Sequence, residues 1–167
     1  MSIQISENII KGSIIYQLTQ LFGDQYTYYG EEIPENFKRP SFHVSRISDV
    51  STKGYTGNEY RFRDDQYRYE IKYFTDKKIN INEDINDKID ILKSGFDYLN
   101  IININNGKID SKPNRINSIE VQTSEDVLMF DLIFPIRVVL PQSVDKVQAN
   151  ILNEYLKETY NKNKGGR

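Results

Sequence analysis

The sequence contains no cysteine and no tryptophan, and its only histidine is His43. These absences exclude a disulfide framework, a thiolate zinc site and a cysteine nucleophile. A serine–histidine–aspartate arrangement would depend on His43 alone, and a single histidine on an alternating strand supplies neither a nucleophile nor an orienting acid. We therefore interpret His43 as a structural or interface residue. We predict that the protein is not an enzyme and uses no metal or cofactor.

The chain also has little net charge and no long apolar run. Its 22 Lys and Arg residues nearly balance 24 Asp and Glu residues, which leaves a formal charge of −2 over 167 residues. A dedicated duplex-DNA binder carries a clear basic excess instead. The most apolar stretch, residues 127–140, is interrupted by Asp131, Pro135 and Arg137 and is too short to span a membrane. We expect neither a membrane partner nor a specific nucleic-acid partner.

Residues 1–11 lack the basic start and apolar stretch of a secretory signal, which predicts a soluble protein that is made inside the cell. The length is enough for one sizeable core. We expect a single α+β domain over residues 1–160, followed by a flexible tail at 161–167.

Apolar residues at helical spacing predict three helices. The first follows a cap at Ser6 and stops at Gly23, the second begins near Asn82, and the third follows a cap at Ser143. The three stripes consist of Ile10, Ile14, Leu18, Leu21 and Phe22; of Ile85, Ile89, Leu92, Phe96 and Leu99; and of Val144, Val147, Ile151, Leu152, Tyr155 and Leu156.

Alternating patterns predict strands between these helices. They lie at residues 26–30, from Ser41 onward, at 59–75, at 119–122 and at 127–140, with a turn signal at 105–107. Residues 50–58, which include Gly54 and Gly57, are typical of the tip of a long hairpin. The alternation changes parity at Asp64-Asp65, which predicts a bulge or a tight turn there. The strand at 127–140 is apolar on both faces, so we place it inside the sheet.

The resulting fold class is α+β. We predict a mixed or antiparallel sheet of about four to six strands with a long hairpin, flanked by about three helices.

Two patterns resemble ligand sites without meeting their requirements. Asn80, Asn82 and Asp84 alternate as in a calcium loop, but the sixth-position Gly and twelfth-position Glu are missing, so an acidic helix start is the better interpretation. The Gly-x-x-Gly at 54–57 is flanked by strand patterns rather than by the helices that a nucleic-acid-clamping loop needs. It is therefore better explained as a hairpin tip.

The richest signal is a region of alternating Tyr and Arg on the predicted hairpin. Its acidic residues, among them Glu59, Asp64 and Glu70, nearly cancel the basic charge. Balanced charge with Tyr and Arg favours a protein interface. An ordinary sheet surface and a stacking platform for single-stranded nucleic acid are the alternatives. The candidate interface residues are Lys53, Tyr55, Tyr60, Arg61, Arg63, Arg68 and Lys72.

The order of the elements resembles that of phage tail terminator (tail completion) proteins from Gram-positive phages and phage-like bacteriocin particles. A first helix and a short Tyr-rich strand precede Pro40-Ser41-Phe42-His43-Val44. Next comes the strand Tyr67-Arg68-Tyr69-Glu70-Ile71-Lys72-Tyr73-Phe74, followed directly by a helix. The last element is the strand Asp126-Val127-Leu128-Met129-Phe130, entered from a turn. The resemblance extends from Ser6 to about Leu156.

This resemblance implies an α+β virion protein, assembled in the host bacterial cytoplasm, that forms a hexameric ring at the head-proximal end of the tail tube. The ring would end tube polymerisation and join the tail to the neck. The implied partners are copies of itself, the tail tube protein, a neck or connector (head-completion) protein and, in a contractile tail, the sheath. The alternatives are another head–tail joining protein, a tail-tube protein and a single-strand nucleic-acid-binding module.

Overall fold

The computed structural model describes residues 7–30, 32–56, 60–105 and 108–140. Within these ranges it holds two helices and seven strands. The α+β class is therefore confirmed. The sequence predicted three helices, and the segment expected to form the third, residues 144–156, lies outside the described residues, as do residues 57–59 of the expected hairpin tip.

Contacts divide the chain into two units. The larger comprises Ile3–Ser51 and Asp65–Ile136, and the smaller comprises Met1–Ser2, Thr52–Asp64 and Arg137–Arg167. In the smaller unit, the described residues are 52–56, 60–64 and 137–140, which are parts of three strands. All side-chain contacts discussed below belong to the larger unit.

A mixed sheet of five strands has the order β1-β2-β3-β7-β6. The short β1 runs parallel to the start of β2, with Tyr29 opposite His43, whereas β6 and β7 form an antiparallel pair. The placement of β7 inside the sheet confirms the prediction made from its apolar faces. The strands are β1 (Thr27–Tyr29), β2 (Ser41–Thr56), β3 (Tyr60–Phe74), β6 (Ser118–Ser124) and β7 (Val127–Leu140).

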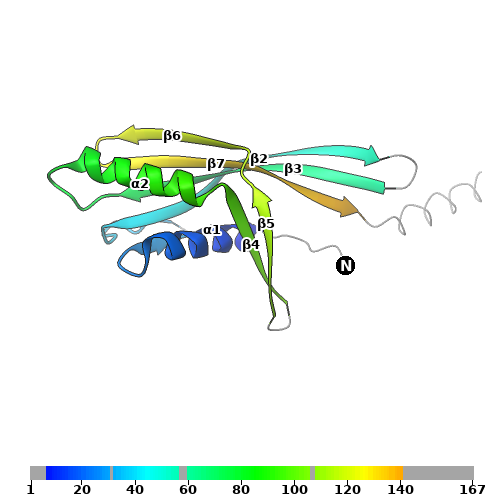
Figure 1. The fold of residues 1–167 in the computed structure, drawn as a ribbon, viewed down its shortest axis with the longest axis horizontal. Coiled ribbons are helices and arrows are strands. Elements are labelled where there is room, and N and C mark those ends of the chain that lie inside the picture. The colour runs from blue at the N-terminus through cyan, green and yellow to red at the C-terminus, as the bar shows by residue number, and fades with distance from the viewer. Residues whose placement is uncertain (1–6, 31, 57–59, 106–107, 141–167) are drawn as a thin grey trace, which may run out of the picture. The chain divides into compact units, whose positions relative to one another are not determined.

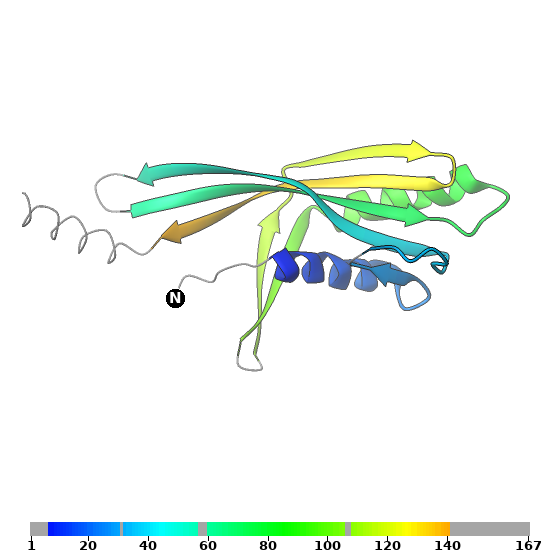
Figure 2. The same cartoon turned by 180° about the vertical axis from the view of Figure 1, so that it is seen from behind.

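Two helices cover one face of this sheet in the larger unit. They are α1 (Glu7–Phe22) and α2 (Ile81–Gly95). Seen from behind, β6, β7 and β3 lie in front of α2, so the opposite sheet face carries no helix among the described elements (Figure 2). A separate antiparallel pair, β4 (Tyr98–Asn105) and β5 (Lys108–Arg115), follows α2 (Figure 1).

The core lies between the helices and the covered sheet face. It contains Ile10, Ile14 and Leu18 from α1, Phe42 and Val44 from β2, Tyr69, Ile71 and Tyr73 from β3, Ile85 and Leu92 from α2, and Leu128, Phe130, Leu132, Phe134 and Ile136 from β7. The alternation of buried and less buried residues along β3 and β7 is the period of two that their sequences predict.

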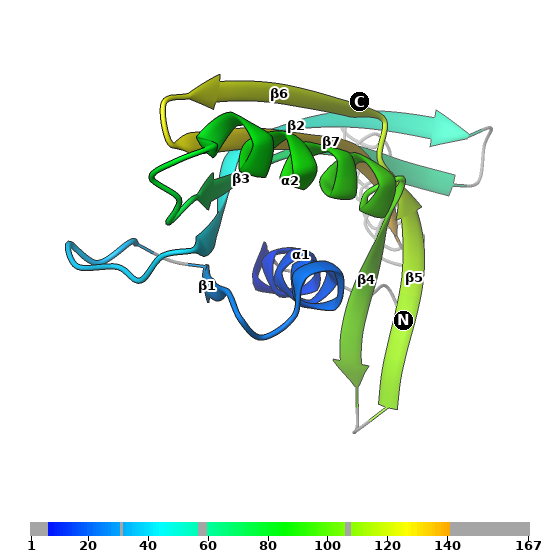
Figure 3. The ribbon, with the colours of Figure 1, turned by 60° about the vertical axis from the view of Figure 1, so that its left-hand side comes forward.

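The first helix runs between β1 on one side and β4 on the other (Figure 3). Polar groups on α1 fix the position of β4. The Gln17 amide donates to the carbonyl oxygens of Gly95 at 2.6 Å and Tyr98 at 2.8 Å, and the backbone N–H of Ile102 donates to the Ser13 hydroxyl at 2.9 Å. These bonds satisfy backbone groups that lie next to buried apolar surface.

The second helix ends earlier than its apolar stripe predicts. Phe96 is already the C-cap and Leu99 belongs to β4, although both side chains are fully buried as expected. Gly95 has poor helix propensity, and a side chain there would collide with Leu21 of α1. Gly95 therefore allows the close approach of α1 at the end of α2, and its poor helix propensity favours the end of the helix there.

The first hairpin strand is longer than predicted, and the second is more regular. β2 continues to Thr56, so residues 50–56 are strand rather than loop. Its Thr residues favour extended backbone, and this preference outweighs the effect of Gly54. β3 passes through Asp64-Asp65 without interruption, so the prediction of a tight turn there was wrong.

One glycine inside the first helix and one directly after it should respond to alanine with opposite signs. Gly23 has φ of 79°, a conformation that a side chain disfavours, so Gly23→Ala is expected to lower the free energy of unfolding by about 1 kcal/mol. Gly12 lies inside the helix with nothing within 4 Å of an added Cβ, so Gly12→Ala is expected to raise it by about 0.5–1 kcal/mol. Urea unfolding of the two variants checks this, and a change of the same sign in both would contradict it.

Candidate assembly surface

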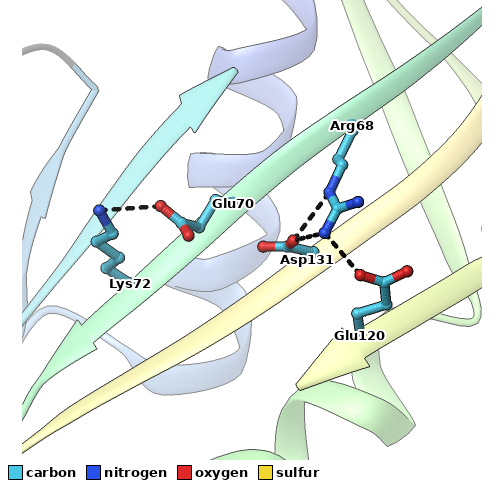
Figure 4. Close-up of polar contacts among 5 residues, drawn as sticks. All are labelled: Arg68, Glu70, Lys72, Glu120 and Asp131. Carbon is cyan, nitrogen blue, oxygen red and sulfur yellow. Dashed lines mark hydrogen bonds and ion pairs between the residues drawn. The ribbon is translucent and has the colours of Figure 1, made fainter. Parts of the chain in front are cut away.

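The uncovered face of the sheet carries a cluster of charged side chains from three adjacent strands. Even-numbered residues of β3 point to this face, because Tyr69, Ile71 and Tyr73 occupy the core side. Arg68 therefore lies beside Asp131 of β7, which is directly opposite Glu120 of β6. Figure 4 shows the three side chains meeting above the strands.

Arg68 bridges the two carboxylates. Its Nε and Nη2 atoms donate to Asp131 Oδ2 at 2.9 and 2.5 Å, and Nη2 also donates to Glu120 Oε2 at 2.6 Å. The bond to Asp131 is the main reason that the pKa of Arg68 is raised. The Asp131 side chain is 11% exposed, whereas those of Arg68 and Glu120 are 33% and 46% exposed. Within the cluster, Asp131 is therefore nearly buried against the sheet, whereas Glu120 is the most exposed to solvent.

A second ion pair continues the cluster along β3. Lys72 Nζ lies 3.0 Å from Glu70 Oε1, and the Lys72 side chain is 34% exposed (Figure 4). The five residues together comprise two cations and three carboxylates. Such a surface has both signs of charge at fixed positions, which gives specificity to a protein contact more than raw affinity.

A third group fixes the loop before β2 at the end of β3. Arg39 forms an ion pair with Asp126 and donates to the carbonyl oxygen of Thr75 at 3.0 Å. Its guanidinium lies over the rings of Phe37 and Phe74, 5.1 and 5.6 Å from their centroids. These contacts connect the end of the loop before β2 with the end of β3 and the start of β7.

The segment whose spacing resembled a calcium loop forms the start of α2. Asn80 is the N-cap of α2, and Asp84 accepts hydrogen bonds from Tyr73 and Thr75, as expected for an acidic helix start. His43 lies on β2 and lines a hollow at the sheet edge. Among the residues that the structure describes, no group of three or more His, Cys, Asp or Glu could hold a metal ion. No described helix is long and apolar enough to cross a membrane.

Comparison with protein families identifies the family to which the chain belongs. A family model described as "Phage tail terminator protein" matches residues 9–146. The chain belongs to the phage tail terminator family. The match covers most of the chain, and it includes α2, the seven described strands and all but the first two residues of α1. No curated protein gives a significant sequence match.

Membership makes this tail terminator a structural component of the phage virion, within a family whose role is not enzymatic. The family predicted from element order is thus confirmed. Of the candidate interface residues, Arg68 and Lys72 lie on the uncovered sheet face of the tail terminator. Lys53 and Tyr55 belong to β2, and Tyr60, Arg61 and Arg63 belong to β3, but their side chains lie outside the described part.

Sequence reasoning missed three of the five charged residues in the cluster. Glu70 was counted only as charge that offsets the arginines, and Glu120 lies on a different strand. Asp131 interrupts the most apolar strand of the chain, and this is the one signal that could have identified it. A carboxylate at that position needs a cation from a neighbouring strand.

Proposed function

We propose that this protein forms a closed ring, a hexamer, on the head-proximal end of the tail tube. There the ring ends tube polymerisation and presents a docking surface to the neck or connector protein, without any catalytic step. Membership of the tail terminator family is the observation that carries this proposal. The mixed-charge cluster on the uncovered sheet face supports it, because that face offers fixed charges to a partner.

The ion pairs also favour a protein partner over single-stranded nucleic acid. Both described cations of the candidate interface, Arg68 and Lys72, already neutralise carboxylates on the same sheet. A backbone-binding surface needs cations to neutralise phosphates instead. We therefore infer that the Tyr- and Arg-rich strands serve assembly.

Purified protein and purified tail tubes test the proposal directly. Electron microscopy should show the protein at one end of each tube, and native mass spectrometry of the bound material should give one ring per tube. Tubes elongated in the presence of the protein should stop growing. Decoration along the whole tube would assign the chain to the tube subunits, and an absence of end binding would overturn the proposal.

Arg68 provides a point variant for the docking surface. Arg68→Gln leaves Asp131 and Glu120 without their shared cation, so it is expected to weaken binding to the tube end or the connector about tenfold, as is typical of an interface arginine. Lys93→Gln removes the same charge from an exposed position in the last turn of α2 and serves as the control. Pull-down titration measures both. Equal affinities of the two variants would show that this face is not part of the docking surface.

A further inference from the structure

The sheet face that carries the charged cluster is not patterned for exposure to water. Besides Asp131, four residues of β7 point to this side, and all four are apolar and half-buried: Val127, Met129, Ile133 and Pro135. A strand that faces solvent on one side usually carries polar residues there. No described helix covers this face (Figure 2). The apolar positions of β7 therefore indicate a surface that is covered by another protein.

The cluster on this face also lacks one positive charge. Arg68 alone serves two carboxylates, Asp131 and Glu120, whereas Lys72 pairs with Glu70. Both bonds from Arg68 to Asp131 end on Oδ2, and the other carboxylate oxygen, Oδ1, is buried without a hydrogen-bond partner in the described part of the chain. Asp131 is only 8% exposed, so the missing bond is costly. One more cation would complete the site.

Glu120 is the place where a cation can enter the cluster. Its side chain is 46% exposed, and among the described contacts only its Oε2 atom is bound by Arg68. A cation that neutralises Glu120 from outside frees Nη2 of Arg68 from its shared position. Arg68 can then bind both oxygens of Asp131, which is a strong arrangement of a guanidinium on a carboxylate. The group that fits here is therefore the ammonium or guanidinium of a protein side chain.

The chain itself carries such a cation on the turn that connects β3 with α2. Lys77 is exposed and forms no ion pair with any residue that the structure describes. Two positions further, Ile79 is 79% exposed, more than any other large apolar side chain among the described residues. Lys78 instead lines a hollow that contains Glu83 and Glu125. Lys77 and Ile79 thus present a positive and an apolar group on one short turn.

This lysine does not reach the cluster of its own subunit. β3 continues from Arg68 to Phe74 before the turn begins, and six residues of strand span about 20 Å. The turn begins at the end of the sheet, where the N–H of Thr75 donates to the carbonyl oxygen of Asp126 at 3.4 Å. Lys77 and the carboxylates can therefore meet only between two copies of the chain.

We propose that the turn of one subunit, residues 76–79, binds the charged cluster of the next subunit, with Lys77 on Glu120 and Ile79 on Met129. The proposal rests on the ring function given above and names the contact that closes the ring. Glu120 lies opposite Asp131, and Met129 is the next residue of β7 on the same side, so the carboxylate and the apolar side chain are neighbours. Lys77 and Ile79 are likewise two positions apart. Both charge and polarity are then complementary.

The contact joins two different surfaces, a turn and a sheet face. Such a contact is heterologous, and it closes into a ring when successive copies are related by rotation. It also explains how Arg68 takes part in assembly, because this residue holds Glu120 in place. The weaker binding expected of Arg68→Gln at the tube end then follows from weaker ring closure.

Charge reversal of the two partners tests this contact in the full-length protein on purified tail tubes. Lys77→Glu places two carboxylates in the contact, and Glu120→Lys places two ammonium groups there. Each single variant is therefore expected to bind tube ends as a ring at least about tenfold more weakly than wild type. The double variant Lys77→Glu/Glu120→Lys restores opposite charges and should form rings again.

A mixture of the two single variants gives a sharper result. Every contact in a ring of alternating variants joins opposite charges, whereas a contact between identical variants joins like charges. Native mass spectrometry of tube-bound protein should therefore show rings with equal numbers of the two variants. Recovery of a complex of two subunits only would show a mutual, isologous contact and overturn the proposal.

Lys93→Glu is the matched control, because it makes the same change of charge at an exposed position in the last turn of α2. It should form rings as wild type does. Rings formed by Lys77→Glu as readily as by wild type, or a mixture that recovers none, would overturn this contact while leaving the ring function intact. The absence of wild-type protein from tube ends would overturn the ring function itself.

Discussion

Replacing Phe42 by alanine is expected to lower the free energy of unfolding by about 3–5 kcal/mol. The Phe42 side chain is fully buried between β2 and α1. Its ring lies 4.7 Å from that of Phe22, 4.9 Å from that of Tyr73, 5.4 Å from that of Tyr26 and 5.8 Å from that of Tyr28. The variant therefore loses both the burial of the ring and its contacts with four aromatic neighbours.

The matched control is an exposed aromatic residue on the first helix. Tyr16 is 53% exposed, so Tyr16→Ala is expected to change the free energy of unfolding by no more than about 0.5 kcal/mol. Urea unfolding followed by circular dichroism gives both values. A loss in Phe42→Ala as small as that in Tyr16→Ala would mean that α1 does not pack on β2 as the structure has it.

Phe42 also shows why much of this fold was predictable. In β2, β3 and β7 the apolar residues alternate, and the alternation alone assigns Phe42, Tyr69 and Phe130 to one buried face. The helical stripe of α1 was equally clear, and Gly23 ended it where its positive φ is found. In these elements local preference and burial agree, so the sequence pattern is sufficient.

The errors arose where a contact distant in sequence overrides the local pattern. The stripe that predicted a helix to Leu99 correctly identified buried residues, but Gly95 packs against Leu21, a residue 74 positions earlier, and the chain then becomes a strand. Spacing cannot reveal that approach, because it depends on how two helices meet. The pairing of β4 with β5 escaped prediction for a similar reason, since only the turn at residues 105–107 gave a local signal.

The charged cluster illustrates the same limit at the candidate site. Arg68, Asp131 and Glu120 are brought together because β7 lies between β3 and β6. Sequence patterns give the face to which each side chain points, but they do not give the order of strands or the register. The composition nevertheless indicated a mixed-charge surface, and the structure shows that its charges are paired.

Removal of Asp84 is expected to produce the second large effect. This carboxylate lies at the start of α2 and accepts hydrogen bonds from Thr75 at 2.6 Å, Tyr73 at 2.7 Å and Lys88 at 3.1 Å. Lys88 is itself 8% exposed, and its ammonium lies 5.4 Å from the ring centroid of Tyr73. Asp84→Ala leaves this ammonium without its carboxylate, which should cost about 3–5 kcal/mol of the free energy of unfolding.

The pKa values of the pair set the pH dependence of this loss. Burial alone would raise the pKa of Asp84, but the bonds from Thr75, Tyr73 and Lys88 outweigh it and hold the pKa below its ordinary value. A lowered carboxyl pKa stabilises the protein above the unfolded-state value of about 3.9, and this contribution disappears as the pH falls through the folded-state pKa. The difference between wild type and Asp84→Ala should therefore shrink below about pH 4.

A double-mutant cycle separates the ion pair from the other hydrogen bonds. Burial alone would lower the pKa of Lys88, but Asp84 and Tyr26 raise it above its ordinary value, so Lys88 retains its charge while the carboxylate is present. Lys88→Met removes that charge and keeps an apolar chain among the aromatic rings. The double variant Asp84→Ala/Lys88→Met should therefore be more stable than Asp84→Ala, because no buried cation is left unpaired.

Asp87→Ala, at an exposed position of the same helix, is the control and should change stability by no more than about 0.5 kcal/mol. Additive effects of the two substitutions would show instead that Asp84 acts through Tyr73 and Thr75 alone, and that the ion pair does not hold α2 against the sheet.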